Sequence, residues 1–441
     1  MGGVSNSAQR KQTLFKTTNK SRETSAGAVL HTRRRGMEVM STRTPIVFIF
    51  ITRLIDSIGF GIVMPVLPQL LLELGSPDLA SAARTAGGML MVYALLQFTC
   101  GPLIGNLSDR FGRRPVILLS LLAFGLDYLL MGVAPTIAWL FVGRAIAGIA
   151  GAVQVPANAF VADITPVEQR ARAFGTVSAA FGIGFILGPA IGGLLGEFGP
   201  RAPFFAAAAL AGLNLAFGIL VLPESLPPSR RRAFSWKRAN PLGAIVALRH
   251  YPSVMGLALV TLLTLVGTNV YPSSWAFFTA IRFDWSPAMI GLSLAVTGIG
   301  MAVVQLTLTG RVVHRLGEWR TALLGLSMAI VAYVSYAVIP HGWMVFPITL
   351  GSALQALCFP ALNAMMSSRV RADAQGELQG AVASLTSVAA IVGPIAMTQS
   401  LAFFTAPRAP VYFPGAPFIL AALLTFTAMS VLRVTARPPA R

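Results

Sequence analysis

The sequence contains one polar stretch, Gly105-Asn-Leu-Ser-Asp109-Arg110-Phe-Gly112-Arg113-Arg114-Pro115, between two long apolar runs. Pro115 can begin a helix and Gly112 permits a tight turn, so the stretch predicts a short loop joining two helices. Asp109 stands where a carboxylate can meet a helix N-terminus or an arginine across the boundary between two rigid bodies. Such a contact can hold one state of a moving pair. The alternative is that the charges only fix the topology of the chain.

Part of this pattern returns later in the chain at a constant offset. Gly105, Arg110 and Gly112 recur as Gly310, Arg315 and Gly317, Gly188-Pro189 recurs as Gly393-Pro394, and Gly175 recurs as Gly380. The matches agree in order and spacing, which predicts two related halves. Two such halves around a central cavity are typical of secondary transporters, because alternating access needs two bodies that rock about a shared site.

The composition predicts a membrane protein. The 441 residues are 55% hydrophobic and 11% charged, whereas soluble chains carry roughly 25% charged residues. Twelve apolar runs are long enough to cross a bilayer: Ile46–Leu72, Gly87–Leu107, Pro115–Ala134, Ile137–Asn158, Thr176–Gly196, Pro203–Leu222, Val254–Phe277, Ala288–Gly310, Thr321–Ile339, Trp343–Met366, Leu378–Ser400 and Tyr412–Leu432. We therefore expect an all-α fold of twelve transmembrane helices in two pseudo-symmetric six-helix bundles.

The net charge of +19 is explained by topology rather than by nucleic-acid binding. Arginine and lysine gather in alternate loops, as expected of cytoplasmic segments. The predicted organisation has both termini inside: a disordered basic tail over 1–44, a first bundle over 45–222, a linker over 223–253, a second bundle over 254–434 and a tail over 435–441. Only two cysteines and four histidines occur, without metal-ligand spacing, so no metal site and no cofactor are expected.

Charged residues inside the predicted spans are candidate functional groups, because a charge is costly in hydrocarbon. Asp56 and Asp127 lie near mid-membrane, and Arg144 lies in the fourth span. A buried carboxyl group can take up and release a proton as access alternates, which makes these three residues candidates for proton coupling. Arg53 lies on the same helical face as Asp56, so a structural ion pair is the alternative reading of that aspartate.

Uncharged polar residues recur within several spans and are candidates for the wall of a wet cavity. They are Tyr93, Gln97, Gln154, Asn158, Thr264, Thr268, Asn269 and Gln305. Hydrogen bonding between helices is the alternative for each of them.

Glycines repeat at every fourth residue in the fifth span, at Gly184, Gly188, Gly192 and Gly196. They form a stripe without side chains, on which another helix can pack closely.

The polar stretch at 105–115 resembles the signature loop of the major facilitator superfamily. The stretches Asp56-Ser-Ile-Gly59-Phe-Gly61, Gly143-Arg144 and Gly184-Phe-Ile-Leu-Gly188-Pro189-Ala-Ile-Gly192-Gly193 extend the likeness, and with Asp127 they resemble tetracycline efflux pumps. The resemblance implies gating by Gly105, Asp109, Arg110, Gly112, Arg113 and Arg114, and an antiporter motif at Gly184, Gly188, Pro189, Gly192 and Gly193. It also implies further coupling groups in the second half, an acid in span nine and a histidine in span eight. Here these positions read Ala329 and Met301.

The leading hypothesis is a monomeric proton antiporter in the bacterial inner membrane that exports tetracycline or a related amphipathic drug. Its partners would be the drug, with Mg²⁺ carried on it as part of the substrate, protons and the lipid bilayer, but no nucleic acid. The alternatives are a multidrug or metabolite transporter, and a receptor or assembly factor on the same scaffold. An enzyme is not expected, because no nucleophile–base set or phosphate-binding loop occurs.

Overall fold

The computed structural model describes residues 47–236, 251–371 and 374–435. Helices dominate these ranges, which contain no strand. The predicted tail over 1–44, most of the predicted tail over 435–441 and the middle of the predicted linker lie outside the described residues.

The predicted number of spans is confirmed. Eleven helical segments of the described chain are long and apolar enough to cross a membrane, and the bent pair Val47–Val63 and Leu67–Glu73 (α2) makes twelve when it counts as one span. The first half continues with α3 (Leu79–Phe111), α4 (Arg113–Val133), α5 (Ile137–Gly151), α6 (Gln154–Ile164), η1 (Val167–Gln169), α7 (Arg170–Gly196), α8 (Ala202–Val221) and η2 (Pro228–Arg230). The second half comprises α10 (Pro252–Thr268), α11 (Val270–Phe283), α12 (Pro287–Thr307), α13 (Thr309–Val338), η5 (Gly342–Met344), α14 (Val345–Ser352), η6 (Ala353–Leu357), α15 (Cys358–Ser367), α16 (Gln375–Thr405) and α17 (Ala416–Thr435).

Several helices extend beyond the predicted apolar runs. The second span begins at Leu79 rather than at Gly87, because the Asp78 side chain accepts a hydrogen bond of 2.7 Å from the backbone N–H of Ser81. This cap satisfies a backbone donor that would otherwise have no partner at the helix end. Polar residues can therefore lengthen a helix past the apolar segment that predicts it.

Four spans are interrupted, one by a bend of 54° and three by a short stretch outside α-helical geometry, and each interruption lies within about one turn of a proline. Proline has no N–H to bond the carbonyl four residues earlier, and its ring crowds that carbonyl. The breaks at 64–66, 152–153, 269 and 353–357 precede Pro68, Pro156, Pro272 and Pro360 accordingly. By contrast, α3, α7 and α16 run on through a proline.

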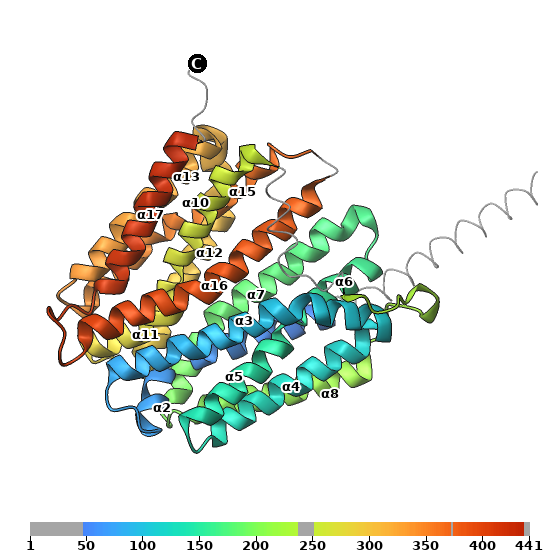
Figure 1. Cartoon of the computed structure of the whole chain (residues 1–441), viewed down its shortest axis with the longest axis horizontal. Helices are drawn as coiled ribbons and strands as arrows, with labels where there is room; N and C mark the ends of the chain where they lie inside the picture. The colour runs from blue at the N-terminus through green and yellow to red at the C-terminus, as the bar shows by residue number, and fades with distance from the viewer. Residues whose placement is uncertain (1–46, 237–250, 372–373, 436–441) are drawn as a thin grey trace, which may run out of the picture.

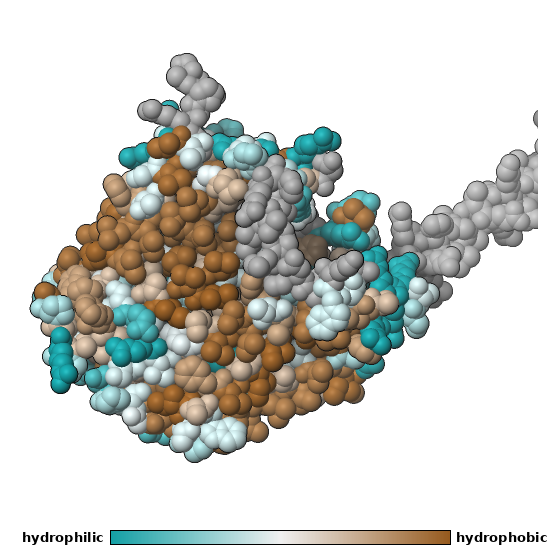
Figure 2. All heavy atoms as spheres, viewed as in Figure 1, coloured by the Kyte–Doolittle hydropathy of each residue, from teal (hydrophilic) through white to brown (hydrophobic). Residues whose placement is uncertain are grey.

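The two halves form two bundles that lie side by side (Figure 1). Helix α3 runs along α16, and α7 runs along α12, so these two pairs form the boundary between the halves. Apolar side chains cover much of the face shown in Figure 2, between hydrophilic patches at opposite ends of the molecule. We call the end that carries Asp109 the inner end and the opposite end the outer end, after the predicted topology.

The glycine stripe of α7 packs on the first helix (Val47–Val63), as predicted. A side chain at Gly184 would meet the backbone of Leu54, one at Gly188 would meet Ile58, and one at Gly192 would meet Ile62. Only a chain without Cβ atoms at these positions allows the two backbones to approach so closely.

Two of the glycine contacts that join the halves involve the prolines that are equivalent in the internal repeat. Gly291 of α12 lies on the carbonyl group of Pro189 and on Gly193 in α7. Gly87 of α3 lies on the side chain of Thr398 and near the carbonyl group of Pro394 in α16. Pro189 and Pro394 occupy equivalent positions in the repeat. Each half thus presents a glycine to the proline-containing helix of the other.

Further contacts join the halves toward the outer end. The side chain of Glu197 accepts a hydrogen bond of 3.1 Å from the backbone N–H of Ala288. Phe277 and Leu401, both from the second half, are buried in a core cluster otherwise made of first-half residues. These contacts join the halves at the outer end, beside a cavity of about 460 Å³ that residues of both halves line, among them Asp78 and Thr405.

Gly291→Ala should weaken the contacts between the halves at the outer end. The added Cβ would collide with backbone atoms, which cannot rotate away, at a cost of about 1–3 kcal/mol for overpacking. We expect a cysteine placed at the buried Leu401 to react several-fold faster with a membrane-impermeant maleimide applied from the outer side. Gly212→Ala is the control, since nothing lies within 4 Å of its Cβ position. Equal labelling rates in the two variants would contradict the assigned contact.

Candidate functional site

A central cavity of about 360 Å³ lies between the halves. The first half supplies most of its polar wall, and the second half supplies a smaller part. The polar and charged lining residues are Arg53, Asp56, Ser57, Tyr93, Gln97, Asp127, Tyr128, Arg144, Gln154 and Asn269, and the aromatic ones include Phe60, Phe124 and Phe181. The three predicted coupling residues therefore face one space.

The predicted cavity residues are only partly brought together. Tyr93, Gln97, Gln154 and Asn269 line the central cavity, and Asn158 lines a neighbouring one. Thr264, Thr268 and Gln305 line neither of these two cavities, and their place on a cavity wall stays a prediction. The Thr264 and Thr268 hydroxyl groups donate to carbonyl groups one turn earlier in their own helix, and Gln305 is exposed on α12.

Asp127 and Arg144 form a buried ion pair. Nη2 of Arg144 donates to Oδ2 of Asp127 at 2.6 Å, and the Asp127 side chain has no exposed surface. Gly143 makes room for this carboxylate, because a Cβ there would lie 2.6 Å from Oδ1. The guanidinium group also lies over the ring of Tyr93, 6.0 Å from its centroid. One fixed charge pair thus connects α3, α4 and α5.

This ion pair is incompletely satisfied. Oδ1 of Asp127 and Nε of Arg144 are buried and have no hydrogen-bond partner. Removing one partner of a buried ion pair typically costs about 3–5 kcal/mol, because the other charge is left uncompensated. The pair is consequently costly to separate, although one acceptor and one donor within it remain without a partner.

Asp56 and Arg53 lie on one face of the first helix, as predicted. Their contact is loose, with 3.7 Å between Nη1 of Arg53 and Oδ2 of Asp56. The Arg53 guanidinium group lies over the ring of Phe181, 5.5 Å from the centroid. Asp56 is therefore not locked in a tight ion pair and remains on the cavity wall.

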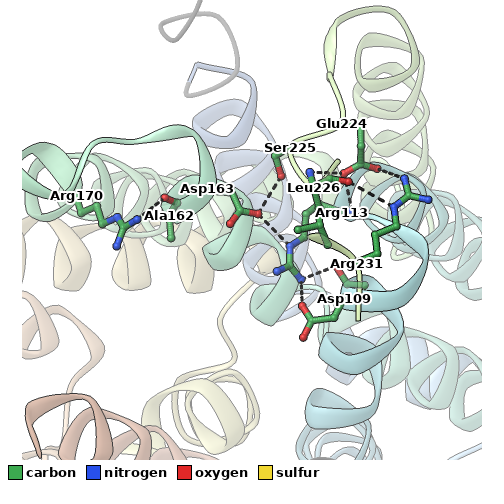
Figure 3. Close-up of polar contacts among 10 residues, drawn as sticks. Asp109, Arg113, Ala162, Asp163, Arg170, Glu224, Ser225, Leu226 and Arg231 are labelled. Carbon is green, nitrogen blue, oxygen red and sulfur yellow. Dashed lines mark hydrogen bonds and ion pairs between the residues drawn. The ribbon is translucent and has the colours of Figure 1, made fainter. Parts of the chain in front are cut away.

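Arg113 is the centre of a second polar cluster, at the inner end (Figure 3). Its Nη1 donates to Oδ1 of Asp109 at 2.6 Å, and its Nε donates to Oδ2 of Asp163 in α6 at 3.2 Å. The Ser225 hydroxyl group also donates to Oδ2 of Asp163. The cluster holds the inner ends of α3, α4 and α6 together.

Glu224 joins this cluster from the segment that follows α8 (Figure 3). Its Oε1 accepts from the backbone N–H of Arg113 at 2.9 Å and from that of Leu226 at 3.0 Å. Arg231 approaches Oε2 at 3.9 Å. The carboxylate thus occupies the N-terminus of α4, where the helix dipole favours negative charge.

The predicted partner of Asp109 is wrong for this structure. Within the part of the chain that the structure describes, the Asp109 side chain binds neither a helix N-terminus nor an arginine of the other half, because Arg113 reaches back one turn within the same half, and Glu224 occupies the N-terminus of α4. The other loop residues for which contacts are described also contact residues of the first half. Arg110 lies over the Phe111 ring, Arg114 donates to the carbonyl group of Ile219, and Gly105 lies against Val155.

Sequence reasoning missed Asp163, Glu224 and the aromatic part of the cavity wall. Asp163 and Glu224 lie at span ends, where a charge is unremarkable. The Pro223-Glu224-Ser225 triplet directly after the sixth apolar run was the available signal for Glu224. The aromatic side chains could not be separated from ordinary membrane-core residues without the fold.

The family model of the Major Facilitator Superfamily matches residues 49–394, which is most of the chain. The chain belongs to the major facilitator superfamily. It is 41% identical over 394 residues to a class C tetracycline resistance protein of Escherichia coli, covering 89% of this chain and 98% of that protein. It is 31% identical over 350 residues to multidrug resistance protein 2 of Bacillus subtilis (strain 168), covering 76% of this chain and 84% of that protein.

A solved structure of a nucleoside transporter shares this fold. It matches with a TM-score of 0.72 and 13% identity, and the match covers 89% of this chain and all of that one. The architecture predicted from sequence, two six-helix bundles of the major facilitator type, is thereby confirmed.

This member of the superfamily has an apolar environment at the two second-half positions that depart from the resemblance. Ala329 of α13 is buried in a cluster with Trp275, Tyr333 and Tyr336. Met301 packs against a smaller apolar cluster that includes Val304 and Leu357. An acid at 329 would lie among aromatic rings, so alanine suits the surroundings that this chain provides.

Gly112→Ala should destabilise the polar cluster around Arg113 at the inner end, by more than the strain in the backbone alone would. Gly112 has φ +108, and its Cβ would collide with the carboxylate of Glu224. Gly75→Ala is the matched control, with φ +99 and nothing within 4 Å. Both variants are strained by a positive φ, at a cost of about 1–3 kcal/mol, but only Gly112→Ala displaces Glu224 from α4. We expect a lower melting temperature of the purified protein for Gly112→Ala than for Gly75→Ala. Equal melting temperatures would remove the assigned role of Glu224.

Proposed function

We propose that the protein exports tetracycline, or a closely related amphipathic drug, across the bacterial inner membrane in exchange for protons. The observation that carries this proposal is the central cavity, in which Asp56 and the Asp127–Arg144 pair face the same space. The similarity to a tetracycline resistance protein over nearly its full length supports the choice of drug.

The chemistry divides between two parts of the cavity wall. The rings of Phe60, Phe124 and Phe181 offer apolar faces to the fused rings of a drug. Asp56 is the main proton carrier, because its carboxylate is loosely held and lines the cavity. A carboxyl group that is exposed alternately to the two sides can bind a proton on one side and release it on the other.

Alternating access follows from the two bundles. The contacts at Gly291 and Gly87 hold the halves together while either end opens. The chain works as a monomer with both termini in the cytoplasm, and it needs the bilayer, the drug and protons as partners. The superfamily and the fold are those of transporters rather than of enzymes.

A multidrug exporter is the second candidate. The mainly aromatic and apolar cavity wall favours it, as does the similarity to a multidrug resistance protein. A metabolite carrier has less support, because it would need cavity charges matched to its substrate. A receptor or assembly factor would not need the complete ion-pair cluster around Arg113.

Asp56→Asn should abolish uphill export while the protein still folds. The amide fills the same space but cannot carry a proton, and proton-transfer groups typically contribute at least about 10²-fold in rate. The measurement is tetracycline uptake into inverted vesicles under a proton gradient, with and without a protonophore. Asp284→Asn is the control, because Asp284 has φ +53 in the α11–α12 loop and asparagine tolerates that backbone. Full proton-dependent uptake by Asp56→Asn would overturn the coupling assignment.

Tetracycline export should depend only weakly on magnesium, so that the drug without bound Mg²⁺ is also a substrate. The described residues contain no group of three or more metal-binding side chains, and Asp127 is occupied by Arg144. Asp56 alone gives a chelated Mg²⁺ a weak hold compared with several oxygen ligands. We expect uptake into inverted vesicles to change little as magnesium varies, and chloramphenicol or a cationic dye to compete. Strict magnesium dependence without competition would contradict this relaxed specificity.

A further inference from the structure

A second cavity of about 300 Å³ lies on the inner side of the central one. The first helix, α6 and α7 form its walls. Arg53, Gln154 and Phe181 line both cavities, whereas Asn158, Phe174, Val177 and Ser178 line only this one. The three shared residues therefore form a partition, and we call the space beyond it the inner cavity.

Arg53 is the charged residue of the partition, and its guanidinium group has a donor that is not used in a hydrogen bond. Nε of Arg53 is buried and has no hydrogen-bond partner, and the contact of this side chain with Asp56 is 3.7 Å long. A guanidinium group donates to planar, oxygen-rich anions in a forked geometry. Arg53 is thus able to bind oxygens that arrive from the inner side without breaking a short ion pair.

The rest of the wall suits an amphipathic ring system. The Phe181 ring, about 44% exposed, lies under the Arg53 guanidinium group, and Phe174 and Val177 pack on an apolar cluster of the first half. Gln154 donates to Asn158 at 3.0 Å, which leaves the carbonyl group of one amide and the amino group of the other for a ligand. Ring faces and hydrogen-bonding groups therefore lie around one space.

The size of the inner cavity sets what it can hold. Pockets for drug-sized molecules measure about 300–1,000 Å³, so this one is at the lower limit. It can accommodate one edge of a drug while the remaining rings pass the partition into the central cavity.

We propose that the inner cavity is a loading subsite for aromatic or polycyclic substrates with an edge of ionised or carbonyl oxygens, which Arg53 binds before the substrate reaches Asp56. The subsite rests on the proposed function and specifies its substrate class. Substrates whose edge is cationic, including a drug edge that carries Mg²⁺, are disfavoured there, because they would meet the guanidinium charge.

Ser178→Phe tests the site, because Ser178 lines only the inner cavity and is exposed, so a larger side chain there can be accommodated without changing the core. We expect the KM for tetracycline uptake into inverted vesicles to rise about tenfold, which corresponds to 1.4 kcal/mol, while the maximal rate stays within about twofold. Ala383→Phe is the matched control, since Ala383 is the repeat equivalent of Ser178 in the other half and is also exposed. Asn158→Leu is the second variant if Ser178→Phe does not fold.

The chemistry of the subsite is tested by binding to the purified full-length protein. Arg53→Gln should weaken tetracycline binding about tenfold or more and leave the binding of a cationic dye unchanged or tighter. Arg53→Lys keeps the charge but loses the forked geometry of the guanidinium group. Its affinity for tetracycline should lie between that of the unaltered protein and that of Arg53→Gln. Equal losses for both ligands would overturn the oxygen-binding role of Arg53.

The subsite and the proposed function fail in different ways. Uptake by the unaltered protein together with an unchanged KM in Ser178→Phe and Asn158→Leu would overturn the subsite alone. No tetracycline uptake by the unaltered protein would overturn the proposed function and the subsite with it.

Discussion

The ion pair between Asp127 and Arg144 is the constraint on which the first half is organised. A charge without a partner is expensive inside a membrane, so these two side chains must stay together wherever the bundle places them. The absence of a side chain at Gly143 lets the carboxylate lie against α5, and the guanidinium group then reaches the ring of Tyr93 on α3. Three helices are fixed by one interaction, and the cavity is the space that remains beside it.

The two halves have similar helix arrangements, but different side chains occupy their centres. The first carries the cavity charges, whereas the centre of the second is a network of aromatic rings with hydroxyl and amide partners. Trp275 donates to Ser293, Gln355 donates to the Tyr271 hydroxyl group, and the rings of Trp275 and Tyr336 meet edge to face with centroids 5.0 Å apart. Such a core resists rearrangement, because each buried polar group already has its partner. The centre of the second half is therefore more fully hydrogen-bonded than that of the first.

Much of this architecture could be predicted from the sequence, because a membrane imposes strong periodic requirements. Apolar length predicted the spans, and the recurrence of Gly-Pro predicted the two halves. The same reasoning predicted one face for Arg53 and Asp56, since helical spacing alone decides it. By contrast, the pairing of Asp127 with Arg144 and that of Arg113 with Asp163 depend on how separate helices dock, which no local pattern records.

The differences between expectation and structure also have physical causes. The Thr264 and Thr268 hydroxyl groups could bind a substrate or their own helix, and the carbonyl group one turn earlier is always within reach. Helix breaks were not predicted, although proline chemistry explains each of them, because other prolines lie inside continuous helices. Tertiary packing decides between a bend and a break, and it is absent from a single sequence.

The paired glycine contacts between the halves have a geometric consequence. A single contact would allow one bundle to rotate about several axes relative to the other. Two separated contacts define one axis that passes through both of them. Rotation about the line through the Gly87–Thr398 and Gly291–Pro189 contacts is the motion that keeps both contacts in place. It widens the gap on one side of that line as it narrows the gap on the other. Such a motion opposes a continuous aqueous path across the membrane, because the boundary closes on one side as it opens on the other.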